Sequence, residues 1–171
     1  MNRKSLEFKG NLFEAYLSMS ISELIPDSKC ILNKEIYSPY LRKDTQIDLI
    51  IITKRYVNVI EAKNWDSYIK GTYDDTHWQG KGASQIMTVF NPINQNAIHV
   101  RALQKLVYDN TSSFIPCKSF IVVPDGCNIE TKCSEVINTS VLRREITKQM
   151  TTVADKEIDS SYYYDVILNK V

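Results

Sequence analysis

The sequence has no long hydrophobic run and few residues that break regular structure. Only five glycines and five prolines occur among 171 residues, which excludes collagen-like and low-complexity proteins. The longest apolar run, residues 49–52, is far too short to span a bilayer. The charged N-terminus is not followed by a continuous apolar stretch, so we expect no secretory signal. These absences predict a cytoplasmic protein that makes no membrane contact.

Excess charge and closely spaced metal ligands are also lacking. The 21 basic and 20 acidic residues leave a formal net charge of +1, which argues against tight, non-specific DNA binding. A nuclease is not excluded, because acidic metal ligands cancel basic phosphate contacts in the sum. Of the four cysteines, Cys127 and Cys133 are spaced C-x5-C with no histidine nearby. This spacing does not fit a zinc site and favours reduced thiols.

The chain does contain clear helical and strand patterns. Apolar residues at helical spacing (Phe13, Leu17, Ile21 and Leu24) predict a first helix that Pro26 ends, and Asn91–Pro92 is a typical helix start. Helices are therefore expected at residues 6–25, from Asn91 onward, and at residues 141–150 and 155–170. β-Branched residues predict strands at residues 30–37, 46–53, 56–63 and 118–123, with a short strand near Val136 and a small hairpin over residues 68–78.

The order of these elements predicts the fold class. Short connections make the first three strands antiparallel, whereas the crossover through a helix makes the third and fourth strands parallel. We therefore expect an α/β protein, a three-layer α/β/α sandwich with a central mixed sheet. No linker-like segment divides the chain, so residues 1–171 are expected to form a single domain.

The hairpin at residues 46–63 places charged residues together. If Lys54 and Arg55 form its turn, then Asp48 faces Glu61 and Gln46 faces Lys63, so Asp48, Glu61 and Lys63 converge on one face. Two opposed carboxylates in apolar strands repel each other and are costly to bury. A divalent cation between them removes both costs, and oxygen ligands suit Mg²⁺. The alternative for Glu61 and Lys63 is a surface ion pair.

Other candidate residues lie on the two long helices. Glu14 has apolar neighbours in the first helix, although the solvated side is the commoner place for a helical glutamate. Gln95 and His99 lie one turn apart on the second helix, where His99 is alternatively a surface histidine. The candidate phosphate contacts, for which ordinary surface charge is an equal alternative, are Lys70, Lys81, Arg101 and Lys105.

Several motifs in order resemble those of the nuclease-related domain family, NERD, a branch of the PD-(D/E)XK nucleases. The resemblance covers residues 9–106. The matching motifs are Gly10-x-x-x-Glu14, Thr45-Gln46-Ile47-Asp48, Val59-Ile60-Glu61-Ala62-Lys63-Asn64-Trp65, the lone Trp78, and Asn91-Pro92-Ile93-Asn94-Gln95-Asn96.

The resemblance implies a restriction-endonuclease-like fold, completed by strands and helices in residues 114–171. It also implies hydrolysis of phosphodiester bonds, with DNA as the nucleic-acid partner. Mg²⁺ would be the cofactor, and Mn²⁺ could substitute for it. By the same resemblance, Asp48 and Glu61 are metal ligands, the Ala62 carbonyl is a third, and Glu14 completes or supports the metal site.

The resemblance further implies that Lys63 orients or activates the attacking water and that Gln95 positions Lys63 or the substrate. His99 stands where the related Q-x-x-x-Y motif has tyrosine. Phe13, before Glu14, stands where the family usually has glycine, and the hairpin turn has Arg55-Tyr56 where the family tends to have a glycine nearby.

Two other functions fit parts of this sequence. One is a non-catalytic module that binds nucleic acid with a nuclease fold, although the intact catalytic trio argues against it. The other is an interaction domain, in which Tyr162–Tyr164 and the apolar residues after them form a homodimer surface. We favour the interpretation that this segment packs a terminal helix onto the core. Because the net charge is so small, a homodimer or a partner protein is an alternative source of the contacts that bind the substrate.

Overall fold

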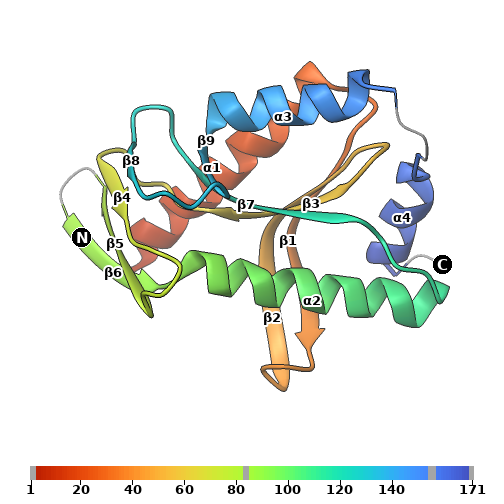
Figure 1. Ribbon diagram of the computed structural model, residues 1–171, viewed down its shortest axis with the longest axis horizontal. Helices are drawn as coiled ribbons and strands as arrows, with labels where there is room; N and C mark the ends of the chain where they lie inside the picture. Colours follow the sequence, from red (N-terminus) through yellow and green to blue (C-terminus); the bar gives the residue numbers. More distant parts are fainter. Residues whose placement is uncertain (1–2, 83–84, 154–156, 170–171) are drawn as a thin grey trace.

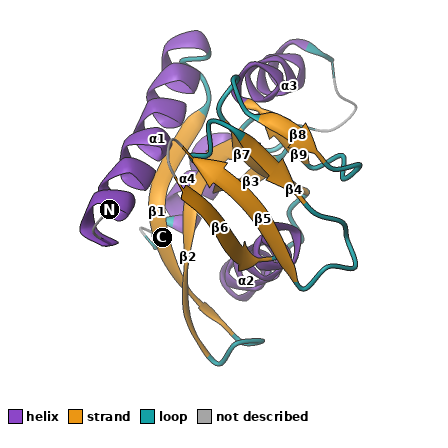
Figure 2. Ribbon diagram, turned by 90° about the vertical axis from the view of Figure 1, so that its left-hand side faces the viewer, coloured by secondary structure: helices purple, strands orange, loops and turns teal. Residues whose placement is uncertain are grey.

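The computed structural model describes residues 3–82, 85–153 and 157–169, with side chains from residue 12 onward (Figure 1). Its helices flank a five-stranded sheet, and a smaller four-stranded sheet lies at one end (Figures 1 and 2). The helices are α1 (Arg3–Leu24), α2 (Pro92–Thr111), α3 (Thr139–Thr151) and α4 (Ser160–Ile167). No helix in these ranges is both long enough and apolar enough to cross a membrane.

The larger sheet is mixed, as the connections predicted, and its strand order is β1-β2-β3-β7-β9. The pairs β1–β2 and β2–β3 are antiparallel, whereas β3–β7 and β7–β9 are parallel. The central strand β3 is buried along nearly its whole length, as expected for a strand covered on both faces. The strands of the larger sheet are β1 (Lys29–Ser38), β2 (Lys43–Ile52), β3 (Val57–Ala62), β7 (Cys117–Val123) and β9 (Val136–Asn138).

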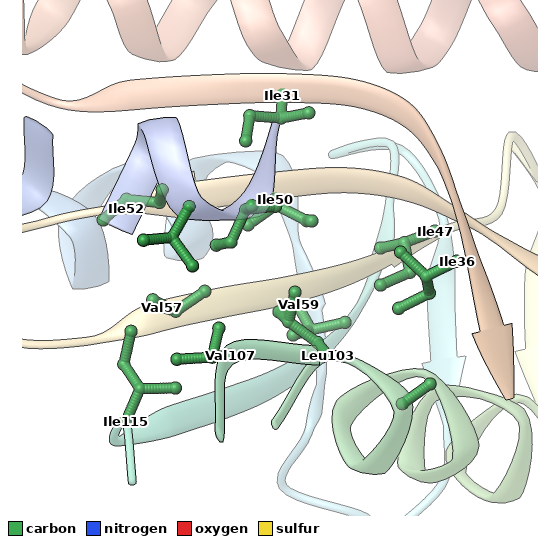
Figure 3. Packing of buried hydrophobic residues seen from close by; sticks show 13 residues of the cluster. Ile31, Ile36, Ile47, Ile50, Ile52, Val57, Val59, Leu103, Val107 and Ile115 are labelled. Atoms are coloured by element: carbon green, nitrogen blue, oxygen red, sulfur yellow. The ribbon is translucent and has the colours of Figure 1, made fainter. Parts of the chain in front are cut away.

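Two hydrophobic clusters attach helices to the two faces of this sheet. Ile50 and Val59 pack with Leu103 of α2 and Ile167 of α4 on one face, part of which Figure 3 shows. The α1 and α3 helices cover the opposite face, where Ile51 and other residues of the adjacent strands pack. The fold is therefore the predicted α/β/α sandwich. The residues of α1, β2, β3, β7 and α3 in the second cluster include Leu17, Ile21, Leu49, Ile51, Ile60, Phe120 and Leu142.

The turn between β2 and β3 has the predicted length and needs no glycine. Ile52 pairs with Val57, and the Thr53 N–H donates to the Tyr56 carbonyl over 3.0 Å. The Thr53 hydroxyl also accepts from the N–H groups of Arg55 and Tyr56, at 3.3 and 3.1 Å. These bonds satisfy the backbone of the turn, and none of its residues has a positive φ, which explains how the chain forms the turn without glycine.

The faces of the hairpin β1–β2 switch at Asp48. Ile47 and Ile50 lie in the same cluster, although regular alternation would place them on opposite faces. In β1, Ile31 and Ile36 likewise lie in one cluster although they are five residues apart, and Asn33, between them, has a φ of +50°. Beyond this point the hairpin leaves the plane of the sheet and projects past α2 (Figures 1 and 2). The irregularity therefore lies next to one of the predicted catalytic residues.

The smaller sheet was only partly foreseen. The predicted hairpin at residues 68–78 exists, because β4 pairs antiparallel with β5, but β5 extends to Gly82. We missed β6, whose side chains are mostly exposed, and β8, whose parallel pairing with β4 joins segments about 60 residues apart. A three-residue strand with a distant partner leaves no local pattern. The strands, in spatial order, are β6 (Gln85–Phe90), β5 (His77–Gly82), β4 (Tyr68–Lys70) and β8 (Asn128–Glu130).

The two tryptophans attach the small sheet to the large one. Trp65 and Trp78 are buried in a cluster with Ile69 of β4 and Ile121 of β7. A Cβ atom on Gly80 would overlap the Trp65 ring, so glycine is required for this close approach. Trp65 and Trp78, which belong to the motifs that resemble the family, therefore have a structural role: they position the small sheet.

The ends of the chain differ from the predictions in detail. Leu24 was expected in the buried stripe of α1, but its side chain is 53% exposed, because the helix ends there. The last helix begins at Ser160, capped by the Asp159 side chain, rather than at residue 155. Residues 154–156 and 170–171 lie outside the described residues. Val166 and Ile167 are buried in the cluster with α2, as expected for a terminal helix that packs onto the core.

A buried polar network ties α3 to the hairpin β2–β3. The side-chain amides of Asn58 and Gln149 exchange two hydrogen bonds, at 2.9 and 2.8 Å, and the Thr53 hydroxyl donates to Gln149 over 2.9 Å. All three side chains are at most 3% exposed. Because every amide here has a partner, the network holds α3 in one position on the sheet.

We predict that Gln149→Leu lowers the free energy of unfolding by about 2–3 kcal/mol, because the buried Asn58 amide loses both of its hydrogen bonds to Gln149 and Thr53 loses one. The matched change Lys148→Leu, on the exposed face of the same helix, should change it by less than about 0.5 kcal/mol. Urea unfolding of both variants measures the difference. Equal stability of the two variants would show that the network does not stabilise the fold.

Candidate active site

The structure brings the predicted site residues together from four elements. Glu14 comes from α1, Asp48 from β2, Glu61 from β3, Lys63 from the residues just after β3, and Gln95 from α2. Their charges act on one another. The pKa of Glu14 is affected by Asp48 and Lys63. The pKa of Asp48 is affected by Glu61 and Lys63. The pKa of Glu61 is affected by a hydrogen bond from Gln95. Residues separated by as many as 81 positions in the sequence thus form one cluster.

Asp48 lies where the sheet opens. Counted from the turn, the last pair in the ladder between β2 and β3 is Leu49 with Ile60, one residue before Asp48. In the ladder between β1 and β2, neither Asp48 nor Asn33 is paired. The Ala62 N–H instead donates to Asp48 Oδ2 over 2.8 Å. The break in the ladders leaves the Asp48 carboxylate free to take this hydrogen bond from the neighbouring strand.

The predicted apposition of Gln46 and Lys63 does not occur. The ladder between β2 and β3 ends at Leu49 and Ile60, before it could reach this pair. The exposed Gln46 side chain instead donates to Asn33 Oδ1 over 2.7 Å. The face switch at Asp48 is the physical reason, because it interrupts the alternation from which the apposition was counted.

Glu61 and Lys63 form an ion pair, but a buried one. Lys63 Nζ lies 2.5 Å from Glu61 Oε1, and the Glu61 residue is 1% exposed. Burial raises the pKa of Glu61, whereas the charge and hydrogen bond of Lys63 lower it. The surface ion pair weighed for these residues is therefore wrong in its position, since the pair lies at the end of the central strand.

Glu14 faces the protein interior. It is 8% exposed, so the solvated position weighed for it is wrong. Burial and the charge of Asp48 raise the pKa of Glu14 to about 7, against the influence of Lys63. Burial and Glu61 likewise raise the pKa of Asp48 to about 7. Three carboxyl groups with raised pKa values therefore interact electrostatically with one ammonium group.

His99 is also buried, at 2% exposure, so it is not a surface histidine. Burial and the charge of Lys63 lower its pKa to about 4, which makes the ring neutral at pH 7. His99 Nε2 lies 3.0 Å from the Thr45 hydroxyl, and Nδ1 lies 3.5 Å from Glu61 Oε2. If Thr45 donates to Nε2, the proton of the ring lies on Nδ1 and points toward Glu61. Sequence reasoning left the role of His99 open and did not assign one to Thr45.

The asparagines of the Asn91–Asn96 motif have structural tasks. Asn91 caps α2 by accepting from the N–H groups of Ile93 and Asn94, and its amide donates to carbonyls in the loop 72–75. Asn96 Nδ2 donates to the Val59 carbonyl over 2.9 Å. These bonds fix the start of α2 against β3 and the small sheet, and so set the position of Gln95 and His99.

The donor atoms fit a hard divalent cation. In the described ranges, no group of three His, Cys, Asp or Glu side chains is arranged to hold a metal ion as the side chains stand. However, Glu14 Oε2 and Glu61 Oε2 are buried without a hydrogen-bond partner. Buried carboxylate oxygens without partners are costly, and a cation with oxygen ligands would remove that cost. The chemistry of the two orphaned carboxylate oxygens therefore suits a divalent cation.

The candidate phosphate contacts lie in different surroundings. Lys105 Nζ pairs with Asp109 at 2.5 Å on the exposed side of α2, so its charge is largely compensated. Lys70 and Lys81 lie on β4 and β5 of the small sheet. Arg101 lines a cavity of about 540 Å³ that is also bordered by Gln95 and His99. Of these four residues, Arg101 therefore has the clearest connection to the cluster.

We predict that the metal-free protein loses stability as the pH rises. Glu14 and Asp48 have folded pKa values of about 7, above their ordinary values of 4.5 and 3.8. The folded state therefore binds more protons than the unfolded state between these values, and its extra stability, on the order of 1–3 kcal/mol, is present at pH 4 and lost by pH 8. Urea unfolding in EDTA at pH 5 and pH 8 measures this loss.

Glu14→Gln should flatten this pH dependence, because the amide does not titrate. The matched control is Glu23→Gln, at an exposed position of the same helix, which should leave it unchanged. A wild-type stability that increases from pH 5 to pH 8 would contradict the raised pKa values.

Comparison with known proteins gives the family. The chain is 29% identical over 125 residues to an uncharacterized protein of Bacillus anthracis, a match that covers 72% of this chain and 57% of that protein. The chain thus spans little more than half the length of this relative. No solved structure matches this chain. The nuclease-related domain matches residues 9–124, which extends past the predicted 106 to include β7. The chain therefore belongs to the nuclease-related domain family, and its mixed sheet with flanking helices agrees with the placement of that family among the PD-(D/E)XK nucleases.

Proposed function

We propose that residues 1–171 act as one cytoplasmic nuclease domain that hydrolyses phosphodiester bonds in DNA, with Mg²⁺ as its cofactor and Mn²⁺ as a substitute. One observation carries the proposal: the buried Glu61–Lys63 ion pair has two further carboxyl groups, buried Glu14 and partly buried Asp48, close enough to interact with Lys63 electrostatically. A structural core would not gather like charges in this way, because burying each costs several kcal/mol without a partner. Membership of a nuclease-related family supports the same conclusion.

The residues that would hold the metal are Asp48, Glu61, Glu14 and the Ala62 carbonyl. When bound, Mg²⁺ would lower the pKa of a water molecule and offset negative charge on the phosphate. Glu61 is held at Oε1 by Lys63, and the neutral His99 ring lies 3.5 Å from its unpartnered Oε2. Asp48 is held at Oδ2 by the Ala62 N–H. These contacts orient the carboxylates before any ligand arrives, which reduces the entropy lost on binding.

Lys63 would contribute a fixed positive charge and several N–H donors beside the reacting phosphate. Its side chain is 16% exposed, so it can reach a ligand at the edge of the site while Glu61 anchors it. The ammonium group would orient the attacking water and stabilise the charge that develops on the phosphate oxygens. Gln95, which favours the ionised form of Glu61, would keep that carboxylate able to bind a cation.

We predict that Asp48→Asn and Glu61→Gln each reduce Mg²⁺-stimulated cleavage by at least about 100-fold, because each removes a charged oxygen ligand. Both should also weaken Mn²⁺ binding, measured by calorimetry without DNA. The matched control is Asp109→Asn, at a 51%-exposed carboxylate on α2, which should retain both properties. Wild-type rates in the two site variants would reject the assignment.

The cleavage panel for the wild-type chain should contain plasmid, linear duplex, single-stranded DNA and RNA, each with Mg²⁺ or Mn²⁺. Cleavage of any DNA form supports the nuclease function. Binding of DNA without turnover of any member would instead identify a non-catalytic module with a nuclease fold.

A second prediction separates Lys63 from the metal ligands. Lys63→Met should lower the cleavage rate by about 100-fold or more, since the charge beside the phosphate is lost, but should leave Mn²⁺ binding intact. The control Lys148→Met removes an exposed lysine from α3 and should change neither measurement. Loss of Mn²⁺ binding in Lys63→Met would mean that Lys63 organises the metal site rather than the phosphate.

A further inference from the structure

A cavity of about 540 Å³ opens directly beside the cluster around Lys63. Its walls include Thr45, Gln95 and His99. His99 Nδ1 lies 3.5 Å from Glu61 Oε2, so one wall of the cavity is formed by residues that contact the candidate metal ligands. Pockets that bind small ligands have volumes of about 300–1,000 Å³. The cavity therefore has a suitable size and position to hold a part of the substrate next to the phosphate to be cut.

Two aromatic side chains from separate elements line this cavity. Tyr40 lies in the turn between β1 and β2 and is 70% exposed, and Phe90 is the last residue of β6 and is 45% exposed. The hairpin that carries Tyr40 projects past α2 because of the face switch at Asp48 (Figures 1 and 2). Both the hairpin and the small sheet thus bring an exposed ring to the same cavity.

The charges around the cavity suit a nucleotide. Among its described lining residues Arg101 is charged and none is acidic, whereas the carboxyl groups lie behind Gln95 and His99. A guanidinium group can bind a phosphate or stack on a base. The amides of Asn94 and Gln95 can donate to and accept from the polar edge of a base.

We propose that this cavity binds one unpaired nucleotide of a DNA strand, whose base stacks on Tyr40 and Phe90 while the adjacent phosphate lies at Lys63. Inside a duplex, neighbouring base pairs cover both faces of each base, so away from the duplex ends an aromatic side chain can stack only on a base that is unpaired or extruded. This inference rests on the nuclease function proposed above. It makes single-stranded DNA, or a single-stranded part of a duplex, the substrate.

The test measures binding apart from cleavage. Fluorescence anisotropy would compare a labelled single-stranded 12-mer with the matched duplex, using the complete chain with Ca²⁺ in place of Mg²⁺ and confirming that the DNA stays intact. We expect tighter binding of the single strand. Tyr40→Ala and Phe90→Ala should each weaken that binding about fivefold or more, the lower end of what one base–aromatic stack contributes. Duplex binding should change less than twofold.

Three controls make the result specific for stacking. Tyr40→Phe keeps the ring and should retain wild-type affinity. Phe114→Ala removes a ring that is 82% exposed but lies outside the described lining of the cavity, and it should have no effect. A single-stranded DNA that contains 2-aminopurine should show quenching with the wild-type chain and Tyr40→Phe, and less quenching with Tyr40→Ala.

The outcomes distinguish this inference from the proposed function. If the wild-type chain prefers duplex, or if the alanine variants bind single strands normally, the stacking site is wrong even if DNA is still cleaved with Mg²⁺. If the stacking signature is present but no DNA is cut with Mg²⁺ or Mn²⁺, the nuclease function fails and the binding site stands. Tighter binding of the matched single-stranded RNA would overturn the assignment to DNA.

Discussion

The structure of this site depends on the buried ion pair between Glu61 and Lys63. Glu61 lies at the end of the central strand, 1% exposed, in a position where an unpaired carboxylate would cost several kcal/mol. Lys63 compensates this charge at 2.5 Å, and it also favours the ionised forms of Glu14 and Asp48. The ammonium group thus contacts one carboxylate and favours the ionised form of two others, in a region from which hydrophobic packing would otherwise exclude charge. The remaining orphaned oxygens, on Glu14 and Glu61, leave this compensation incomplete.

Incomplete compensation connects stability to function. Raised pKa values at Glu14 and Asp48 mean that the folded protein would prefer these groups protonated, whereas binding a cation requires them ionised. The two hydrophobic clusters on the faces of the sheet stabilise the fold that keeps the acids together. The charged groups at the site lower the stability of the folded state, as is usual where such groups are arranged for binding or chemistry rather than for packing.

A chain of contacts connects the small sheet to the same site. Trp65 and Trp78 attach that sheet to β7, and Asn91 links its loop 72–75 to the start of α2. The helix then places Gln95 and His99 beside Glu61. The small sheet also contributes Phe90 to the cavity. An accessory hairpin in the sequence is therefore part of the structure that positions the site and, in our proposal, part of the surface that receives the substrate.

Local patterns in the sequence determined the main architecture. The helical stripe of α1, the β-branched runs of β2 and β3 and the Asn91–Pro92 start of α2 were recognisable because their buried side chains repeat at fixed intervals. Sequence register also gave the pairing of Ile50 with Val59, and hence the neighbourhood of Asp48 and Glu61. The same register predicted that Lys63 lies near them, and the motifs shared with the family added Glu14 and Gln95 as candidate companions.

Only the tertiary structure decided the features that depend on distant contacts. The face switch at Asp48 left Gln46 bonded to Asn33, because a break in alternation involves two strands and is invisible in one. The burial of Glu14 and His99 depends on which helix covers which end of the sheet. The pairing of β4 with β8 and the shared cavity of Tyr40 and Phe90 join segments that are far apart in the sequence. Periodicity reports which side of an element is buried, but the identity of its neighbour is set by the fold as a whole.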